Sequence, residues 1–123
     1  MDVCAVKVYR DLIVWQKAVE LVLSVYKLLP KLPDSEVYSL ASQIKRAAVS
    51  VPSNIAEGYG RGTKEYIHFL RVARGSLFEL ETQLIIVDKL FGIINNDKIY
   101  GNCKEIEKML NVMIRKLEDK ICK

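Results

Sequence analysis

Histidine and cysteine are scarce in this 123-residue chain, and their scarcity excludes several kinds of site. The single histidine, His68, leaves no second imidazole for a metal site and no spare base for a nucleophilic triad. The three cysteines, Cys4, Cys103 and Cys122, form an odd set without a short paired spacing. That pattern argues against a disulfide framework and against a zinc site. We expect ordinary buried or terminal thiols.

Long apolar runs are also missing. No stretch approaches the ~20 apolar residues that a membrane-spanning helix needs. Charges at Asp2, Lys7 and Arg10 interrupt the start, where a signal peptide would need an unbroken apolar segment. We therefore expect a cytoplasmic protein without a membrane segment. The length suits one hydrophobic core, so we expect a single domain over residues 1–123, with residues 1–10 as an N-terminal arm.

Apolar residues recur with helical spacing along four segments, which we expect at about residues 11–29, 35–56, 63–91 and 99–117. The third and fourth segments are the most regular, with apolar residues alternately four and three positions apart, as in helices that pack side by side. Short loops separate the segments. The pattern predicts an all-α protein, an antiparallel up-down-up-down four-helix bundle.

The residues that we expect to face the core share this spacing. They are Leu12, Trp15, Val19, Val22, Tyr26 and Leu29 in the first segment; Val37, Leu40, Ala41, Ile44, Ala47, Ala48 and Val51 in the second; Tyr66, Leu70, Ala73, Leu77, Leu80, Leu84, Val87 and Phe91 in the third; and Ile99, Cys103, Ile106, Leu110, Met113 and Leu117 in the fourth.

Pro52 falls inside the second segment. Its ring removes the backbone hydrogen bond to the carbonyl of Ala48, at a cost of roughly 3 kcal/mol unless other contacts compensate. We therefore expect the helix to kink at Pro52. The kink either is held by local contacts or shapes a groove or a subunit contact.

Four polar residues surround the proline: Ser50, Ser53, Asn54 and Glu57. The hydroxyls and the amide can bond backbone groups that the proline frees. The Glu57 carboxylate can pair with an arginine of the third segment, Arg71 or Arg74. In the alternative, Glu57 faces a partner.

Three glycines follow at alternate positions, Gly58, Gly60 and Gly62. No strand precedes them, so neither a phosphate-binding loop nor a dinucleotide fingerprint is credible. We interpret them as turn formers that end the helix through the left-handed conformation, with Thr63 as a cap for the next helix.

Glu65 and His68 have the Glu-x-x-His spacing of di-metal sites in bundles. A complete site needs a second such pair and two more glutamates, and His68 falls on the outward face. We interpret the match as accidental and expect no metal, no cofactor and no catalytic residue. An enzyme with a site near Pro52 is a third and weaker hypothesis.

Basic residues are concentrated in one stretch. Residues 41–75 contain six Lys or Arg against two Glu, whereas residues 76–97 contain one Lys against four Asp or Glu. A cluster of this kind is compatible with binding to phosphate backbones, with Tyr59 placed to stack on a base. A solvated face, or a complement to an acidic patch on a neighbouring subunit, would give the same pattern. The candidate nucleic-acid-binding residues are Lys45, Arg46, Arg61, Lys64, Arg71 and Arg74.

The chain has more apolar residues than one bundle core requires. The residues in excess are Ile13, Val14, Leu23 and Val25 in the first segment and Phe78, Ile85 and Ile86 in the third. Gly75 and Ser76, small residues in the middle of a helix, would let another backbone approach. We expect self-association, against the alternative of a wide core face in a small protein.

Three stretches together resemble a known family: LIVWQKAVEL over residues 12–21, QIKRAAVSVPSNIAEGYGR over residues 43–61 and ARGSLFELETQL over residues 73–84. They are similar to four-helix-bundle proteins named for open reading frames in intervening sequences of bacterial 23S ribosomal RNA genes. The resemblance covers roughly residues 9–120. It implies an antiparallel bundle that assembles as a homopentamer, with nucleic-acid binding as the usual proposal.

Carried over by position, the resemblance implies Arg46, Arg61, Arg71 and Arg74 as phosphate contacts. Pro52, Asn54 and Glu57 match the family signature without a known chemical role. A related branch, the accessory variability-determinant proteins of diversity-generating retroelements, is basic and works with a reverse transcriptase. This chain departs from that branch in being only mildly basic, with a net charge of +4.

The leading hypothesis is therefore a non-enzymatic bacterial protein that forms a ring and binds RNA or DNA through a basic face. The alternative is a protein-interaction scaffold or an accessory subunit of a nucleic-acid enzyme such as a reverse transcriptase.

Overall fold

The computed structural model describes residues 8–93 and 97–122. Cys4 and most of the predicted N-terminal arm lie outside these residues. The described residues form four α-helices and no strand: α1 (Ile13–Leu28), α2 (Leu40–Gly58), α3 (Thr63–Phe91) and α4 (Asp97–Ile121), with short 3-10 turns η2 (Tyr9–Asp11), η3 (Leu29–Lys31) and η4 (Asp34–Glu36). The prediction of an all-α four-helix bundle is confirmed.

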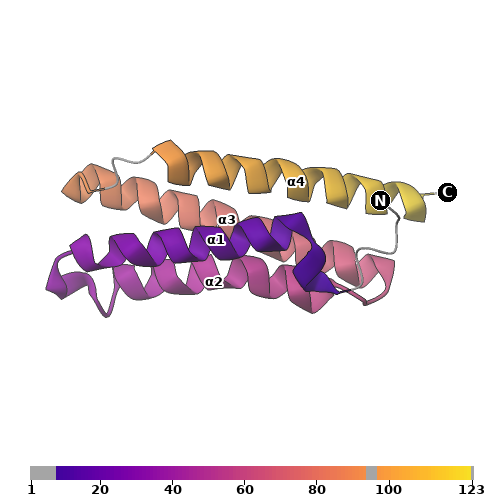
Figure 1. Cartoon of the computed structure of the whole chain (residues 1–123), viewed down its shortest axis with the longest axis horizontal. Coiled ribbons are helices and arrows are strands. Elements are labelled where there is room, and N and C mark those ends of the chain that lie inside the picture. The colour runs from indigo at the N-terminus through magenta and orange to yellow at the C-terminus, as the bar shows by residue number, and fades with distance from the viewer. Residues whose placement is uncertain (1–7, 94–96, 123) are drawn as a thin grey trace.

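The four helices lie side by side, as Figure 1 shows. The connection between α1 and α2 lies at one end of the bundle, and the connection between α2 and α3 lies at the other. The end of α3 and the start of α4 return to the first end. In the described ranges, none of the helices combines the length and the apolar character needed to cross a membrane.

The core faces of α3 and α4 are largely the predicted ones. Leu70, Ala73, Leu77, Leu80, Leu84 and Val87 of α3 are buried, as are Ile99, Cys103, Ile106 and Leu110 of α4. The ends of the two faces differ, because Tyr66, Met113 and Leu117 are only half-buried, Phe91 is exposed, and Ile67 and Ile114 are buried instead.

The predicted core face of α1 is wrong by one residue. Tyr26 is exposed and the other residues predicted to face inward are half-buried, whereas the buried residues are Val14, Ala18, Leu21 and Val25. Both sets follow the same alternation of four and three positions, so periodicity alone does not separate them. The bulky rings of Trp15 and Tyr26 lie at the edge of the bundle, against Tyr9 and Lys45 respectively. Val14 and Val25 belong to the core and are unavailable for self-association.

The second segment also begins later than predicted. The chain from Asp34 to Glu36 forms the turn η4, and α2 starts at Leu40. Val37 therefore lies before the helix and is 45% exposed instead of facing the core. Leu40 is half-buried, and the other residues of the predicted inward face of α2, from Ala41 to Val51, are buried.

The three glycines after Pro52 have different roles, so the prediction of three turn formers is only partly right. Gly60 has a left-handed φ of 85°, whereas Gly62 has a φ of −58° and precedes Thr63, the first residue of α3. Gly58 is the last residue of α2 and is buried. A Cβ atom there would lie 2.6 Å from the Cβ of Phe69, so Gly58 lets the end of α2 approach α3 closely.

Candidate nucleic-acid interface

Lys64 and Arg71 line a common groove of about 370 Å³ between the start of α3 and the end of α4. The Arg71 guanidinium forms an ion pair with Glu118 of α4, and both side chains are well exposed. The floor of the groove includes Ile67 and Ile121. This groove brings two of the six predicted residues together beside an acidic residue that the sequence analysis did not consider.

Arg74 continues the same side of α3 one turn further along. Its Nη1 donates a hydrogen bond of 2.8 Å to the Oδ1 of Asn111 in α4, and the side chain is half-buried. Arg115 of α4 is exposed and lies one turn beyond Asn111 on its helix. We call the surface formed by Lys64, Arg71, Arg74 and Arg115 the α3–α4 basic surface.

Arg61 forms ion pairs within the turn between α2 and α3. Its Nη2 pairs with the Glu57 carboxylate, its Nη1 lies 3.2 Å from Oε2 of Glu65, and its Nε donates a 2.8 Å hydrogen bond to the Glu57 carbonyl. The hydrogen bond to the Glu57 side chain and then that to Glu65 raise the guanidinium pKa above its ordinary value. The guanidinium also lies 4.9 Å from the ring centre of Phe69. Arg61 therefore ties together the turn between α2 and α3.

The same contacts correct the predicted partner of Glu57. The carboxylate pairs with Arg61, four residues later, and not with Arg71 or Arg74, which reach across to α4. This choice of partners follows from helix geometry, because Arg71 and Arg74 lie on the side of α3 that faces α4, away from α2.

Lys45 and Arg46 lie on α2 and are separate from the α3–α4 basic surface. The Nζ of Lys45 lies 5.5 Å from the ring centre of Tyr26, on the side of α2 that faces α1. Arg46 lines a different groove of about 600 Å³ between α2 and α3, where the hydroxyls of Ser50 and Ser76 share a 2.8 Å hydrogen bond. The six predicted residues therefore do not form one continuous surface.

Two of the polar residues around Pro52, Ser53 and Asn54, bond to the backbone of their own helix. The Ser53 hydroxyl donates to the Val49 carbonyl at 2.7 Å, and the Asn54 amide donates to the carbonyl and to the hydroxyl of Ser50, both at 2.8 Å. These carbonyls follow directly after the one that the proline frees. The side chains thus support the helix around Pro52, which is itself buried, without reaching the freed carbonyl.

Tyr59, predicted to stack on a base, is half-buried, and its ring packs edge-on against Tyr66 with 6.1 Å between ring centres. Burial, and then the proximity of Tyr59, raise the pKa of the Tyr66 hydroxyl to about 12. The two tyrosines lie at the end of the bundle, on either side of Arg61 in the sequence.

Residues that could carry metal or thiol chemistry are dispersed over the described part of the chain. His68 is exposed and packs against Phe69 with 5.3 Å between ring centres. No group of three His, Cys, Asp or Glu side chains in the described ranges is placed to hold a metal ion. Burial, followed by the nearby Glu81, raises the pKa of the Cys103 thiol to about 12.

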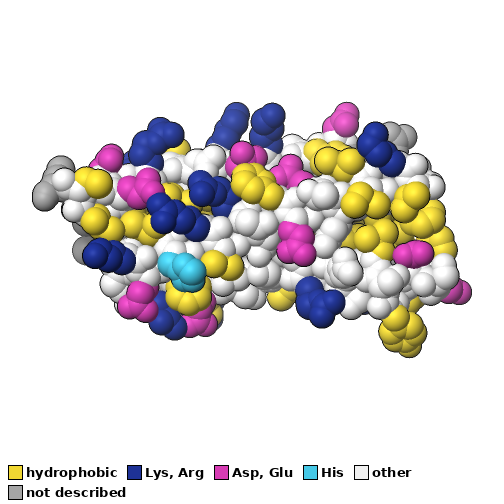
Figure 2. All heavy atoms as spheres, turned by 180° about the vertical axis from the view of Figure 1, so that it is seen from behind, with side chains coloured by type: hydrophobic (Ala, Val, Ile, Leu, Met, Phe, Trp, Pro, Cys, Tyr) yellow, Lys and Arg dark blue, Asp and Glu magenta, His cyan; other side chains and the backbone are white. Residues whose placement is uncertain are grey.

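Charge on the face that Figure 2 shows is distributed unevenly along the bundle. Most of its Lys and Arg side chains lie over the half that holds the start of α3 and the end of α4, and hydrophobic side chains gather over the other half. Exposed apolar residues from the middle to the end of α3 include Phe78, Ile85, Ile86 and Leu90. We call these two parts of the face the basic end, where Asp and Glu side chains are interspersed among the cations, and the apolar end.

These features define a four-helix-bundle protein with a basic surface across two neighbouring helices. The profile of the family described as 23S rRNA-intervening sequence protein matches residues 10–112, and the chain belongs to that family. Comparison with curated proteins finds no match.

Proposed function

We propose that this protein is non-enzymatic and binds RNA or DNA through the α3–α4 basic surface. The observation that carries the proposal is the shared groove of Lys64 and Arg71, which Arg74 of α3 and Arg115 of α4 extend along the helix pair. The pair between Arg71 and Glu118 is exposed, and such pairs contribute only about 0–1 kcal/mol. A phosphate can therefore replace Glu118 as the partner of Arg71 at little cost.

The test removes the two groove cations together, as Lys64→Ala with Arg71→Ala. Binding is measured by fluorescence anisotropy with a labelled single-stranded RNA and a labelled DNA duplex over a range of salt concentrations. Each lost phosphate contact lowers the slope of log affinity against log salt by ~0.7 on single strands and ~0.9 on duplex. We expect the double variant to lose about 1.4 and about 1.8 units of slope respectively.

The matched control is Lys45→Ala with Arg46→Ala, which removes the same charge from α2. Because these residues lie away from the basic surface, the control should keep nearly the full slope. If both double variants lost the same amount of slope, the effect would come from net charge alone, and the assigned surface would be rejected. An absence of binding by the parent protein would reject nucleic-acid binding itself.

Self-association is the second part of the proposal, with the homopentamer that the resemblance implies as the expected state. It is supported by apolar residues that the single chain leaves exposed, such as Leu23 of α1 at 58% and Phe78 of α3 at 43%. Sedimentation velocity should show one oligomeric species, and Phe78→Glu should shift it toward the monomer. A monomer at high concentration would refute the ring.

The alternative function is an accessory subunit whose partner is a protein such as a reverse transcriptase, as in the related retroelement branch. It is favoured by the apolar end of the face in Figure 2. Association with a purified reverse transcriptase that survives nuclease treatment would support this alternative over direct nucleic-acid binding. We also propose a bacterial cytoplasmic setting, and an antiparallel bundle whose second helix bends at Pro52.

A further inference from the structure

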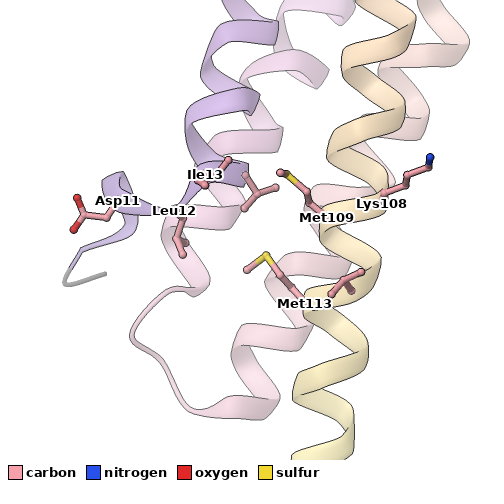
Figure 3. A pocket seen from close by; sticks show the side chains of 8 residues that line it. Asp11, Leu12, Ile13, Lys108, Met109 and Met113 are labelled. Atoms are coloured by element: carbon pink, nitrogen blue, oxygen red, sulfur yellow. The ribbon is translucent and has the colours of Figure 1, made fainter. Parts of the chain in front are cut away.

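An open apolar groove of about 510 Å³ lies between the start of α1 and the middle of α4. Its apolar lining consists of Leu12, Ile13, Val14, Met109, Val112 and Met113. Figure 3 shows the two methionine side chains extending from α4 toward the start of α1. None of the residues that line this groove belongs to the α3–α4 basic surface.

The groove exposes side chains that would be buried by a partner of suitable shape. Ile13 is 59% exposed and Val112 is 46% exposed, although both are aliphatic. A hollow between two neighbouring helices accepts a third amphipathic helix, whose apolar residues at i, i+3, i+4 and i+7 fill it. Methionine side chains suit such a surface because they adapt to different partner shapes.

The charges around the groove differ between its two sides. On α4, the neighbours of Val112 at positions −4, +3 and +4 are Lys108, Arg115 and Lys116, all exposed. On the side of α1, the groove ends at Asp11. A ligand that fits can therefore place negative charges beside Lys108, Arg115 and Lys116. Lys17, one turn after Ile13, and Glu105, one turn before Met109, pair with each other at 3.1 Å.

The chemistry of the apolar lining favours a protein over a nucleic acid. Its side chains are aliphatic or thioether, whereas single-stranded nucleic acids are held mainly by bases stacked on aromatic rings. We propose that the groove between α1 and α4 binds an amphipathic helix of another protein, with its apolar stripe between the two helices and acidic residues facing Lys108, Arg115 and Lys116.

The probe is a displayed library of helical peptides with randomised surface positions, selected on the full chain. We expect the enriched peptides to combine an apolar stripe with net negative charge. A synthetic copy of one such peptide should lose at least tenfold in affinity for Val112→Glu, which places a carboxylate in the groove. Lys116→Glu should weaken it several-fold and reduce the salt dependence of binding.

The matched control is Val49→Glu on α2, where the parent valine is 42% exposed, close to the exposure of Val112. This variant should bind the peptide like the parent, and circular dichroism should show both variants folded. Enrichment of basic peptides, or of none, would overturn the proposal, as would an equal loss in Val49→Glu.

Two further outcomes would assign the groove to another occupant. If Val112→Glu dissociates an oligomer of the parent protein in the absence of peptide, a second copy of the chain fills the groove. If deletion of residues 1–7 raises peptide affinity more than tenfold, the start of the chain itself fills it. Nucleic-acid binding by the same variants is measured separately, so failure of one proposal leaves the other open to its own test.

Discussion

Substitution of Gly58 by alanine tests how closely α2 approaches α3 at the basic end of the bundle. The new Cβ would lie 2.6 Å from the Cβ of Phe69 and 3.2 Å from Cδ1 of Tyr66. The Phe69 Cβ is fixed to its backbone and cannot rotate away, so the helices must separate by about 1 Å to restore an ordinary carbon contact. Overpacking of this kind costs ~1–3 kcal/mol, and alanine returns up to ~1 kcal/mol of helix propensity.

The expected net loss is therefore about 1–2 kcal/mol in the free energy of unfolding, or a fall in Tm of about 4–8 °C. It is measured by urea unfolding followed by far-UV circular dichroism, with the m-value checked for constancy. The matched control is Gly101→Ala in α4, where an added Cβ meets nothing within 4 Å. That variant should gain ~0.5–1 kcal/mol. The packing argument is refuted if Gly58→Ala is as stable as the parent, or if the two variants change in the same direction.

Three further predictions concern thiol reactivity, pH and the proline. At mildly alkaline pH, a maleimide should label exposed Cys122 quickly and Cys103 only on unfolding, because burial raises the Cys103 pKa to about 12; mass spectrometry of the labelled peptides shows which thiol reacted. Burial, and then Glu107, raise the pKa of the Glu81 carboxyl, so the native state holds this proton more tightly than the unfolded chain, and its contribution to stability is lost as pH rises through the folded pKa. Glu81→Gln should thus be more stable than the parent at neutral pH and equal to it below the unfolded pKa, and a pH-independent difference in urea unfolding would contradict the assignment. Pro52→Ala should restore one helix hydrogen bond and be at least as stable as the parent, with an unchanged sedimentation coefficient; loss of the oligomer would make the proline an assembly element.

The buried face of α3 could be predicted from the sequence better than that of α1. The reason is how many apolar series with helical spacing each segment contains. In α3 the series one position after the seam includes the apolar residues Ile67, Phe78 and Ile85, but Arg71, Arg74, Glu81 and Asp88 interrupt it, so the seam is the more continuous apolar face. In α1 a second apolar series lies one residue from the first, and only packing against the other helices decides between Trp15 and Val14. Residues with equivalent periodicity need tertiary information to be ranked.

In the candidate site, ion pairs between residues close in sequence could be predicted, whereas pairs between distant residues could not. The spacing of Glu57, Arg61 and Glu65 at four-residue intervals is a local signal for ion pairs, and it would have indicated that Arg61 is occupied. The pairing of Arg71 with Glu118 has no such signal, because it joins residues 47 positions apart and depends on how α3 and α4 align. The distribution of charge along the chain therefore indicated the basic end, whereas which of its cations lie on one surface depends on how the helices pack.

The geometry of α4 places the two proposed binding sites, the basic surface and the apolar groove, on different edges of the helix. Asn111 and Glu118, seven residues apart, lie on one edge of the helix and face α3. Met109 and Met113, four residues apart, lie on the opposite edge and face the start of α1. A nucleic acid at the first edge and a helix at the second would thus be separated by the width of α4. Arg115 lies between the edges and neighbours both, so electrostatic coupling between the two occupants would pass through its guanidinium and weaken as salt is added.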